Sequence, residues 1–305
     1  MTVDPRTSVG SVDLPCAVLT ASGTAGHGAE LAAYLDLSRL GAVVVKSLAA
    51  EPWPGNPAPR VRPTAAGMLN SVGLQGPGVA SWRADELPGL AATGARVVVS
   101  IWGRSVEDYA AAAAAVAGVG PEVVAVEVNL SCPNLDGGAH LFAHDPSAAA
   151  EVVEATAVGG LPRWAKLSAN TDRVVEVAAA VAAAGAEAVT LINTLLGMVV
   201  DLGTRRPALG GGGGGLSGPA IHPVAVRTVF EVRAALPELP IVGVGGIATG
   251  GDAVEMMMAG ADAVQVGTAT FADPQAPDAV RRGLEHWCEQ HGVPAVRNLK
   301  GMAHG

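Results

Sequence analysis

The chain has 305 residues, of which 50% are apolar, and a formal net charge of −9 at pH 7. Its basic residues are scattered, which argues against a nucleic-acid or anionic membrane surface and favours a small-molecule ligand. The cysteines, Cys16, Cys132 and Cys288, form no CxxC pair, so they support neither a disulfide framework nor a zinc site. They are also too few for an iron–sulfur cluster, which normally needs a fourth cysteine. We expect Cys16 and Cys288 to be small core residues.

No apolar run approaches the ~20 residues that a membrane-spanning helix needs. The polar N-terminus, MTVDPRTSVG, lacks the apolar centre of a secretory signal. We therefore expect a cytoplasmic protein that neither enters a membrane nor is exported.

Short runs rich in Val and Ile alternate with helical stretches, which is typical of repeated βα units around a parallel sheet. The sequence contains eight candidate strands, at residues 16–19, 42–45, 97–101, 123–128, 164–167, 188–192, 241–244 and 263–266. Eight such units favour a closed (β/α)8 TIM barrel over an open doubly wound sheet, with residues 1–305 as one domain.

Capping residues indicate where several intervening helices begin and end. Asp145 precedes a proline at a first helical position, and Thr171 is expected to cap a helix that runs to Ala184 and stops at Gly185. Further helices are expected at residues 223–236 and 252–259, the second of them ended by Gly260.

Two segments, residues 48–80 and 194–222, are too long and too rich in Gly and Pro for a minimal barrel, and each follows a strand directly. In barrels the C-terminal ends of the strands carry the active site, because the loops there vary over a packed scaffold. The polar or small residues at these ends are therefore candidate site residues: Ser22, Lys46, Ser100, Asn129, Lys166, Asn193, Gly245, Gly246, Gly267 and Thr268.

The stretch VEVNLSCPN, residues 126–134, joins a buried strand to a loop that carries Cys132 between two asparagines. A thiol with the ordinary pKa of ~8.5 is only slightly ionised at neutral pH, so it needs cationic or hydrogen-bonding neighbours to act as a nucleophile or general base. Lys46 is one candidate neighbour. The alternative is a loop thiol without a catalytic role.

Glycines follow the last two predicted strands. Gly245-Gly246 and Gly267-Thr268 fit the phosphate site that barrels build after strands seven and eight, where backbone N–H groups approach the phosphate without a Cβ between them. Two ordinary tight turns are the alternative. A dinucleotide fingerprint is not completed, because Ala248 stands where GxGxxG requires glycine.

Lys46 and Lys166 each end a predicted strand. On the ligand face, both would place cations beside a phosphate, a carboxylate or a reduced-flavin anion. They could instead be surface lysines, and Lys166 could be the Schiff-base lysine of an aldolase.

Other features have simpler interpretations. The six glycines Gly210–Gly215 are typical of a flexible loop. The histidines His140, His144 and His222 lack metal-ligand spacing such as HExxH, and we expect them to be solvated or structural.

Nine short segments together carry a family resemblance: KS (46–47), GNPAPRV (55–61), NSVGLQGPG (70–78), NLSCPN (129–134), AKLS (165–168), INT (192–194), GGLSGPAIHPVA (214–225), VGVGGI (242–247) and VGTATF (266–271). In this order and spacing they resemble the class 1 dihydroorotate dehydrogenases, which are flavin enzymes of pyrimidine biosynthesis. The resemblance covers nearly the whole chain.

This resemblance implies an FMN cofactor with its phosphate on Gly245, Gly246, Gly267 and Thr268. The residues implied around its ring and ribityl chain are Ser22, Lys46, Ser47, Ser100, Asn129, Lys166, Ile192 and Gly218. Those implied for dihydroorotate are Lys46, Asn70, Ser71, Val72, Gly73, Leu74, Asn129, Asn193 and Thr194. Cys132 is implied as the base that takes the C5 proton while the C6 hydride passes to the flavin; class 2 enzymes carry serine there.

Segments 200–210 and 285–293 resemble the NAD-linked form of class 1, which implies a homodimer paired with an electron-transfer subunit that holds FAD and a [2Fe–2S] cluster. One departure is Ser100, where the family usually has an asparagine facing the flavin; a serine reaches less far. Three alternatives stay open: a fumarate-linked class 1A enzyme, a dihydropyrimidine dehydrogenase acting on uracil or thymine, and a flavin module for electron transfer or sensing that has lost its chemistry.

Overall fold

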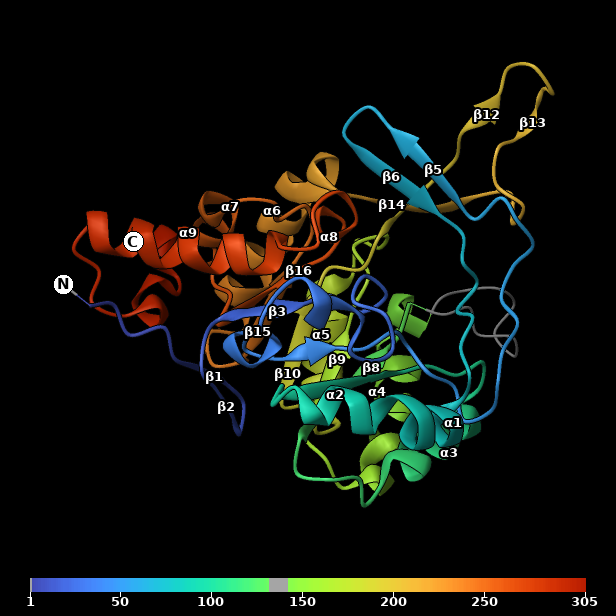
Figure 1. Cartoon of the computed structure of the whole chain (residues 1–305), viewed down its shortest axis with the longest axis horizontal. Helices are drawn as coiled ribbons and strands as arrows, with labels where there is room; N and C mark the ends of the chain where they lie inside the picture. Colours follow the sequence, from blue (N-terminus) through green and yellow to red (C-terminus); the bar gives the residue numbers. More distant parts are fainter. Residues whose placement is uncertain (1, 132–141) are drawn as a thin grey trace.

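The computed structural model describes residues 2–131 and 142–305, and its centre is a sheet of eight parallel strands (Figure 1). Along the sheet the order is β3-β16-β15-β10-β9-β8-β7-β4. The strands are β3 (Val18–Thr20), β4 (Val43–Val44), β7 (Val97–Ile101), β8 (Val123–Asn129), β9 (Arg163–Lys166), β10 (Ala188–Leu191), β15 (Ile241–Val244) and β16 (Ala263–Val266). The predicted bounds differ from these by at most two residues.

Backbone hydrogen bonds join β3 to β4 and close the sheet into a barrel. The N–H of Gly41 donates to the carbonyl of Val18 at 2.7 Å, and that of Thr20 donates to Ala42 at 3.2 Å. The Thr20 hydroxyl also accepts from the N–H of Val44 at 2.9 Å. The predicted (β/α)8 barrel is therefore confirmed.

Helices surround the barrel (Figure 1). The α-helices are α1 (Val79–Ser81), α2 (Leu87–Ala92), α3 (Val106–Val116), α4 (Pro146–Ala155), α5 (Val174–Ala183), α6 (His222–Ala235), α7 (Gly250–Met258), α8 (Ala269–Ala272) and α9 (Ala276–Gln290), and a π-helical turn (Trp82–Glu86) links α1 to α2. Short 3-10 helices cover Glu30–Ala33, Leu37–Arg39, Phe142–His144, Thr156–Gly159, Pro219–Ile221, Val296–Leu299 and Met302–His304. None of the helices in the described residues is long and apolar enough to cross a membrane.

One of the two predicted helix caps is wrong. The Asp145 carboxylate accepts from the N–H groups of Ser147 and Ala148 at 2.8 and 3.0 Å, so it caps α4 as expected. The Thr171 hydroxyl instead accepts from the N–H of Arg173 at 3.1 Å. This bond closes a local turn ahead of α5, whose N-cap is Arg173.

The N-terminal hairpin closes the barrel at the N-terminal ends of its strands. Its strands are β1 (Thr7–Val9) and β2 (Val12–Leu14), which pair antiparallel. Val9, Val12 and Leu14 belong to one buried cluster with Trp164 and other apolar residues of the barrel strands. The N-terminal end of the barrel is therefore packed with side chains, which leaves the C-terminal end for a site.

The two insertions combine at the C-terminal end into a four-stranded antiparallel sheet of order β11-β14-β6-β5. These strands are β5 (Val61–Thr64), β6 (Gly67–Asn70), β11 (Leu195–Gly197) and β14 (Gly214–Ser217). A hairpin of β12 (Val200–Asp201) and β13 (Arg206–Pro207) projects beyond the barrel (Figure 1). Part of the glycine run is thus strand rather than loop, because Gly214 and Gly215 belong to β14.

Candidate active site

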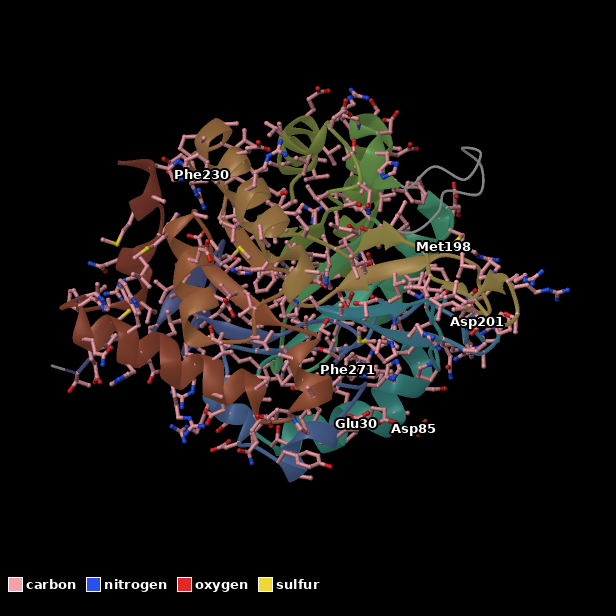
Figure 2. All side chains as sticks on the ribbon, turned by 90° about the horizontal axis from the view of Figure 1, so that it is seen from above. Glu30, Asp85, Met198, Asp201, Phe230 and Phe271 are labelled. Carbon is pink, nitrogen blue, oxygen red and sulfur yellow. The ribbon has the colours of Figure 1, made fainter. Side chains whose placement is uncertain are left out.

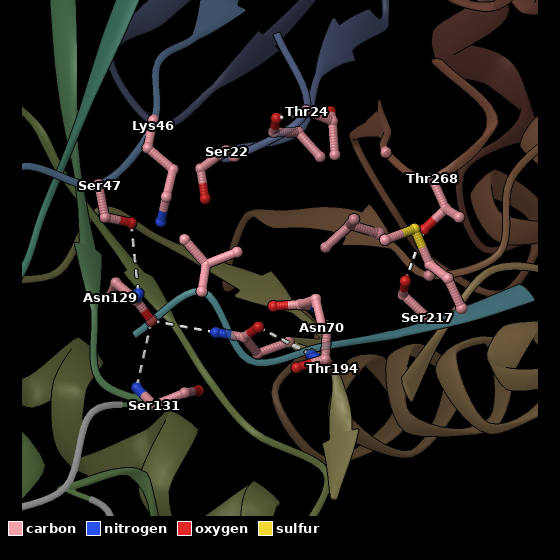
Figure 3. Close-up of a pocket in the computed structure, with 18 of the residues that line it drawn as sticks. Ser22, Thr24, Lys46, Ser47, Asn70, Asn129, Ser131, Thr194, Ser217 and Thr268 are labelled. Carbon is pink, nitrogen blue, oxygen red and sulfur yellow. Dashed lines mark hydrogen bonds between the residues drawn. The ribbon is translucent and has the colours of Figure 1, made fainter. Parts of the chain in front are cut away.

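A cavity of about 320 Å³ opens at the C-terminal end of the barrel, beneath the inserted sheet (Figure 3). Nearly all the candidate residues line it: Ser22, Lys46, Ser47, Asn70, Ser71, Val72, Gly73, Leu74, Asn129, Lys166, Ile192, Asn193, Thr194, Gly218, Gly245, Gly246, Gly267 and Thr268. Cys132, Asn134 and His140 lie outside the described residues. The structure therefore brings together residues that are spread over more than two hundred positions of sequence.

Ser100 is the described candidate that does not line the cavity. It is fully buried in β7, and its hydroxyl lies 2.9 Å from that of Ser47, which does line the cavity. The expectation that Ser100 faces the flavin directly therefore needs correction, because this side chain lies one layer beneath the cavity wall. Its hydroxyl contacts that of Ser47, which itself lines the cavity.

Asn129, at the end of β8, connects several parts of the wall. Its side-chain oxygen accepts from the Asn193 amide at 3.0 Å and from the N–H of Ser131 at 3.3 Å, while its own amide donates to the Ser47 hydroxyl at 3.3 Å. The Tyr109 hydroxyl donates to its backbone carbonyl at 2.5 Å. With these partners the Asn129 side chain is held in one orientation at the cavity wall (Figure 3).

The glycine run packs against the segment that holds Asn70 and Ser71. The Asn70 amide donates to the carbonyl of Gly215 at 3.3 Å. A Cβ atom on Gly215 would lie 2.1 Å from the Thr194 hydroxyl, and one on Gly211 would lie 2.3 Å from that of Ser71. Side chains at these two positions would displace cavity-lining residues, so these glycines allow the backbone of the insertion to approach the site closely.

Lys166 belongs to a buried polar group that the sequence had not indicated. Its ammonium nitrogen lies 3.3 Å from a carboxylate oxygen of Glu127 and 3.3 Å from the Ser22 hydroxyl. The Gln265 amide donates to the other Glu127 oxygen at 2.8 Å. Glu127 is wholly buried and the Lys166 side chain is 6% exposed. A signal was available, because a carboxylate interrupts the otherwise apolar run 123–128 two residues before Asn129, on the same face of the strand.

The turns after β15 and β16 present backbone N–H groups at the cavity. In the described part of the chain, the N–H groups of Gly246, Gly267 and Thr268 donate no hydrogen bond to another protein atom, and all three residues line the cavity. The Thr268 hydroxyl donates to that of Ser217 at 2.7 Å. Because orphan N–H groups suit an anion, this corner fits a phosphate group.

His222, beside the site, has contacts typical of a structural residue. His222 begins α6 and is buried, with Nδ1 2.8 Å from the carbonyl of Gly245 and Nε2 3.3 Å from a carboxylate oxygen of Glu255. Its interpretation as a structural residue agrees with these contacts. Burial, and next the Lys46 cation, hold the pKa of His27 below its ordinary value, so its imidazole is neutral near pH 7.

The two described cysteines are core residues, as expected. Cys16 and Cys288 are both buried. Burial raises the pKa of the Cys16 thiol to about 11 and also raises that of Cys288. Neither thiol lines the cavity.

The sequence matches the family model for dihydroorotate dehydrogenase over residues 6–288. The chain belongs to the dihydroorotate dehydrogenase family. It is 48% identical over 305 residues to a protein of Desulforudis audaxviator, covering 100% of this chain and 99% of that one. It is 45% identical over 302 residues to one of Pelobacter propionicus (99% of each chain) and 46% identical over 299 residues to one of Geotalea uraniireducens (98% of this chain and 97% of that one).

All three relatives are named dihydroorotate dehydrogenase B (NAD(+)), catalytic subunit. The family is one of flavin-dependent oxidoreductases, so the resemblance inferred from the motifs is confirmed. Because the match spans the barrel and both insertions, it includes every element that contributes a described residue to the cavity.

Proposed function

We propose that this protein oxidises dihydroorotate to orotate in pyrimidine biosynthesis, with FMN as the hydride acceptor. The observation that carries the proposal is the cavity, where the corner suited to phosphate, two lysines and four asparagines line one space. Among the described residues, Lys46 and Lys166 are the only charged side chains that line it. A cavity that is cationic and rich in amides suits an anionic substrate with ring amides.

The residues present fit FMN. The N–H groups of Gly246, Gly267 and Thr268 would hold its phosphate. Because these donors have no protein acceptor among the described residues, binding an anion breaks no existing hydrogen bond. The side chains and backbone nearer the barrel axis would surround its ring and ribityl chain: Ser22, Lys46, Ser47, Asn129, Lys166, Ile192 and Gly218. When bound, FMN would supply the two-electron acceptor that no side chain provides.

Asn70, Asn129 and Asn193 would hold the ring amides and the carboxylate of dihydroorotate, with Lys46 supplying the countercharge. The segment from Ser71 to Leu74 and Thr194 would close the substrate side of the cavity. In this proposal Cys132 takes the C5 proton as a general base. The fixed amides around Asn129 favour catalysis because the substrate would be oriented without reorganising the site.

Electrons would leave through a partner. The relatives' names speak of a catalytic subunit and of NAD(+), and this chain has three cysteines, so we propose that a second subunit carries FAD and a [2Fe–2S] cluster. We also propose a homodimer in the cytoplasm. Exposed apolar side chains recur at alternate positions from β11 into the projecting hairpin, at Leu196, Met198, Val200 and Leu202, which supports a protein contact there. Figure 2 labels Met198 in this segment.

The decisive experiment is anaerobic mixing of the FMN-loaded protein with dihydroorotate, followed by the flavin absorbance. We expect the wild-type flavin to bleach and the Cys132→Ala variant to bleach about 10² to 10⁴ times more slowly, as for loss of a general base. Cys16→Ala is the matched control, because Cys16 is a buried thiol that does not line the cavity. Unchanged bleaching in Cys132→Ala would remove the proposed base.

Dihydrouracil is the second substrate to mix with the protein. It lacks the carboxylate, so it loses the interaction with Lys46 and should bleach the flavin far more slowly than dihydroorotate does. Faster bleaching by dihydrouracil would instead favour a dihydropyrimidine dehydrogenase. Rapid reoxidation of the reduced chain by fumarate would favour the class 1A alternative.

A further inference from the structure

We propose that Glu127 is a positioning residue that balances the charge of Lys166 and thereby lowers the reduction potential of the flavin. This inference rests on the proposed binding of FMN. It assigns a role in the proposed electron transfer to a side chain that does not itself reach the cavity.

Three strands supply the group that surrounds Lys166. Glu127 comes from β8, Lys166 from β9 and Gln265 from β16. Both carboxylate oxygens of Glu127 are engaged, one by the Lys166 ammonium group at 3.3 Å and the other by the Gln265 amide at 2.8 Å. The carboxylate is therefore fixed in place behind the lysine, and the lysine is fixed between it and the Ser22 hydroxyl.

Stability alone does not explain a carboxylate at this position. Removing a carboxylate from water costs several kcal/mol, and Glu127 is wholly buried with one cation beside it. Replacing such a pair by apolar side chains of similar volume is often neutral or stabilising. The pair is better explained by what it does to the cavity, which one of its members lines.

The charge count shows that effect. Lys46 and Lys166 line the cavity, and the carboxylate of Glu127 offsets one of their two positive charges. A flavin that accepts electrons becomes more negative, so cations nearby favour the reduced state and anions favour the oxidised state. Glu127 therefore moderates the effect of the lysines and keeps the reduced flavin a stronger reductant. A strong reductant is what passage of electrons to an NAD-type acceptor requires.

The test is the midpoint potential of bound FMN in wild type, Glu127→Gln, Lys166→Met and the double variant, measured at one pH against reference dyes. Glutamine is close in shape to glutamate and keeps a hydrogen-bonding partner for Gln265. We expect Glu127→Gln to shift the bound flavin at least about tenfold toward the reduced form, about 30 mV upward for a two-electron couple. We expect Lys166→Met to shift it in the opposite direction and the double variant to lie near wild type.

Asp262→Asn is the matched control. It also converts a buried, ion-paired carboxylate into an amide, but Asp262 lies just before β16, at the N-terminal end of the barrel, and does not line the cavity. We expect it to lower the stability of the fold and to leave the potential unchanged. An equal upward shift in Asp262→Asn and Glu127→Gln would overturn the proposal, since the effect would then not depend on Lys166.

If Glu127→Gln fails to fold, the comparison of Lys166→Met with the double variant measures the Glu127 charge in the absence of a lone buried cation. The double variant should then have the higher potential, and equal potentials would refute the inference. The two proposals fail separately. Apoprotein that does not quench FMN fluorescence contradicts the proposed cofactor, whereas FMN that binds and bleaches with dihydroorotate but shows no shift contradicts only the role of Glu127.

Discussion

Two buried carboxylates at opposite ends of the barrel have different surroundings. Asp262, just before β16, has Arg233 at 2.9 Å and Lys300 at 2.6 Å, and it also accepts from the N–H of Ile241 at 2.8 Å. Glu127, beside the cavity, has one cation and one amide. At the closed end of the barrel, Asp262 therefore has two cations and a backbone N–H as partners, whereas Glu127 at the open end has one cation and one amide.

This difference separates an ion pair that stabilises the fold from one that belongs to the site. Because Asp262 has two cationic partners, it keeps one of them when the other is removed by mutation. In the pair of Glu127 and Lys166, the lysine has two acceptors among the described residues for its three N–H donors, so one donor remains for a ligand in the cavity. The residues of such a site contribute less to the stability of the fold because some of their hydrogen-bonding groups are kept for a ligand.

The largest expected effect is that of Lys166→Met set against Lys300→Met. Removing Lys166 leaves the buried Glu127 carboxylate without a cation, which costs about 3–5 kcal/mol. Removing Lys300, whose side chain is 37% exposed, leaves Asp262 paired with Arg233 and costs about 0–1 kcal/mol. Urea unfolding of the two apoproteins measures both changes. Similar losses in the two variants would show that the two ends do not differ in redundancy.

The Glu127→Met, Lys166→Met double variant is the internal control for this comparison. Because it removes both charges, it should regain most of the stability that Lys166→Met loses. A double variant as unstable as the single one would mean that the lysine stem, and not its charge, was the stabilising feature.

The sequence predicted the framework of this molecule well. Apolar runs of strand length separated by helical stretches indicated eight parallel strands. Because barrels place their sites at the C-terminal ends of the strands, the polar residues at these ends predicted many of the residues that line the cavity. These runs are recognisable because both faces of each barrel strand are buried, so nearly every position in the strand is apolar. Thr171 was misassigned because a hydroxyl that closes a turn looks the same in sequence as one that caps a helix.

What the sequence could not predict depends on distances between strands. Glu127, Lys166 and Gln265 are 39 and 99 positions apart along the chain, and only the closed barrel makes them neighbours. Ser100 was assigned to the cavity because it lies at a strand end, but the pleat of β7 and the contact with Ser47 place it one layer below. The contacts of Gly211 and Gly215 likewise arise from the pairing of two insertions.

A smaller effect is expected from Ser100→Ala. This change removes the 2.9 Å contact with Ser47 and should cost about 0.5–1.5 kcal/mol of stability, the usual contribution of one hydrogen bond. Because Ser47 also accepts from the Asn129 amide, we expect a higher KM for dihydroorotate with little change in kcat. Steady-state kinetics and urea unfolding measure the two quantities.

Thr156→Val provides the comparison for that variant. Thr156 is a buried residue whose hydroxyl donates to the carbonyl of Val153 at 2.7 Å, away from the cavity. It should lose a similar amount of stability with an unchanged KM. If KM is also unchanged in Ser100→Ala, the layer beneath the cavity wall supports the fold alone.

The smallest effect is expected at the exposed ion pairs of Asp4, which join the N-terminus to the segment after α9. The Asp4 carboxylate contacts Arg6 at 2.8 Å and Arg297 at 2.6 Å. Hydrogen bonds from Arg6, and next from Arg297, hold the pKa of Asp4 well below its ordinary value. Because the unfolded chain binds the proton more tightly, this pair stabilises the fold at neutral pH, and the stabilisation is lost as pH falls below about 4.

Asp4→Asn should therefore be slightly less stable than wild type at pH 7, and its loss of stability should be smaller than that of Ser100→Ala. The gap should stay constant down to about pH 5 and then narrow, because Asp4 takes up a proton in the unfolded wild-type chain at a higher pH than in the folded protein. Because the pair is exposed, added salt should also narrow the gap at pH 7, whereas it should leave the loss in Lys166→Met nearly unchanged. Thermal unfolding at several pH values and two salt concentrations measures this, and a gap that widens in acid would contradict the assignment of Asp4 as the stabilising carboxylate.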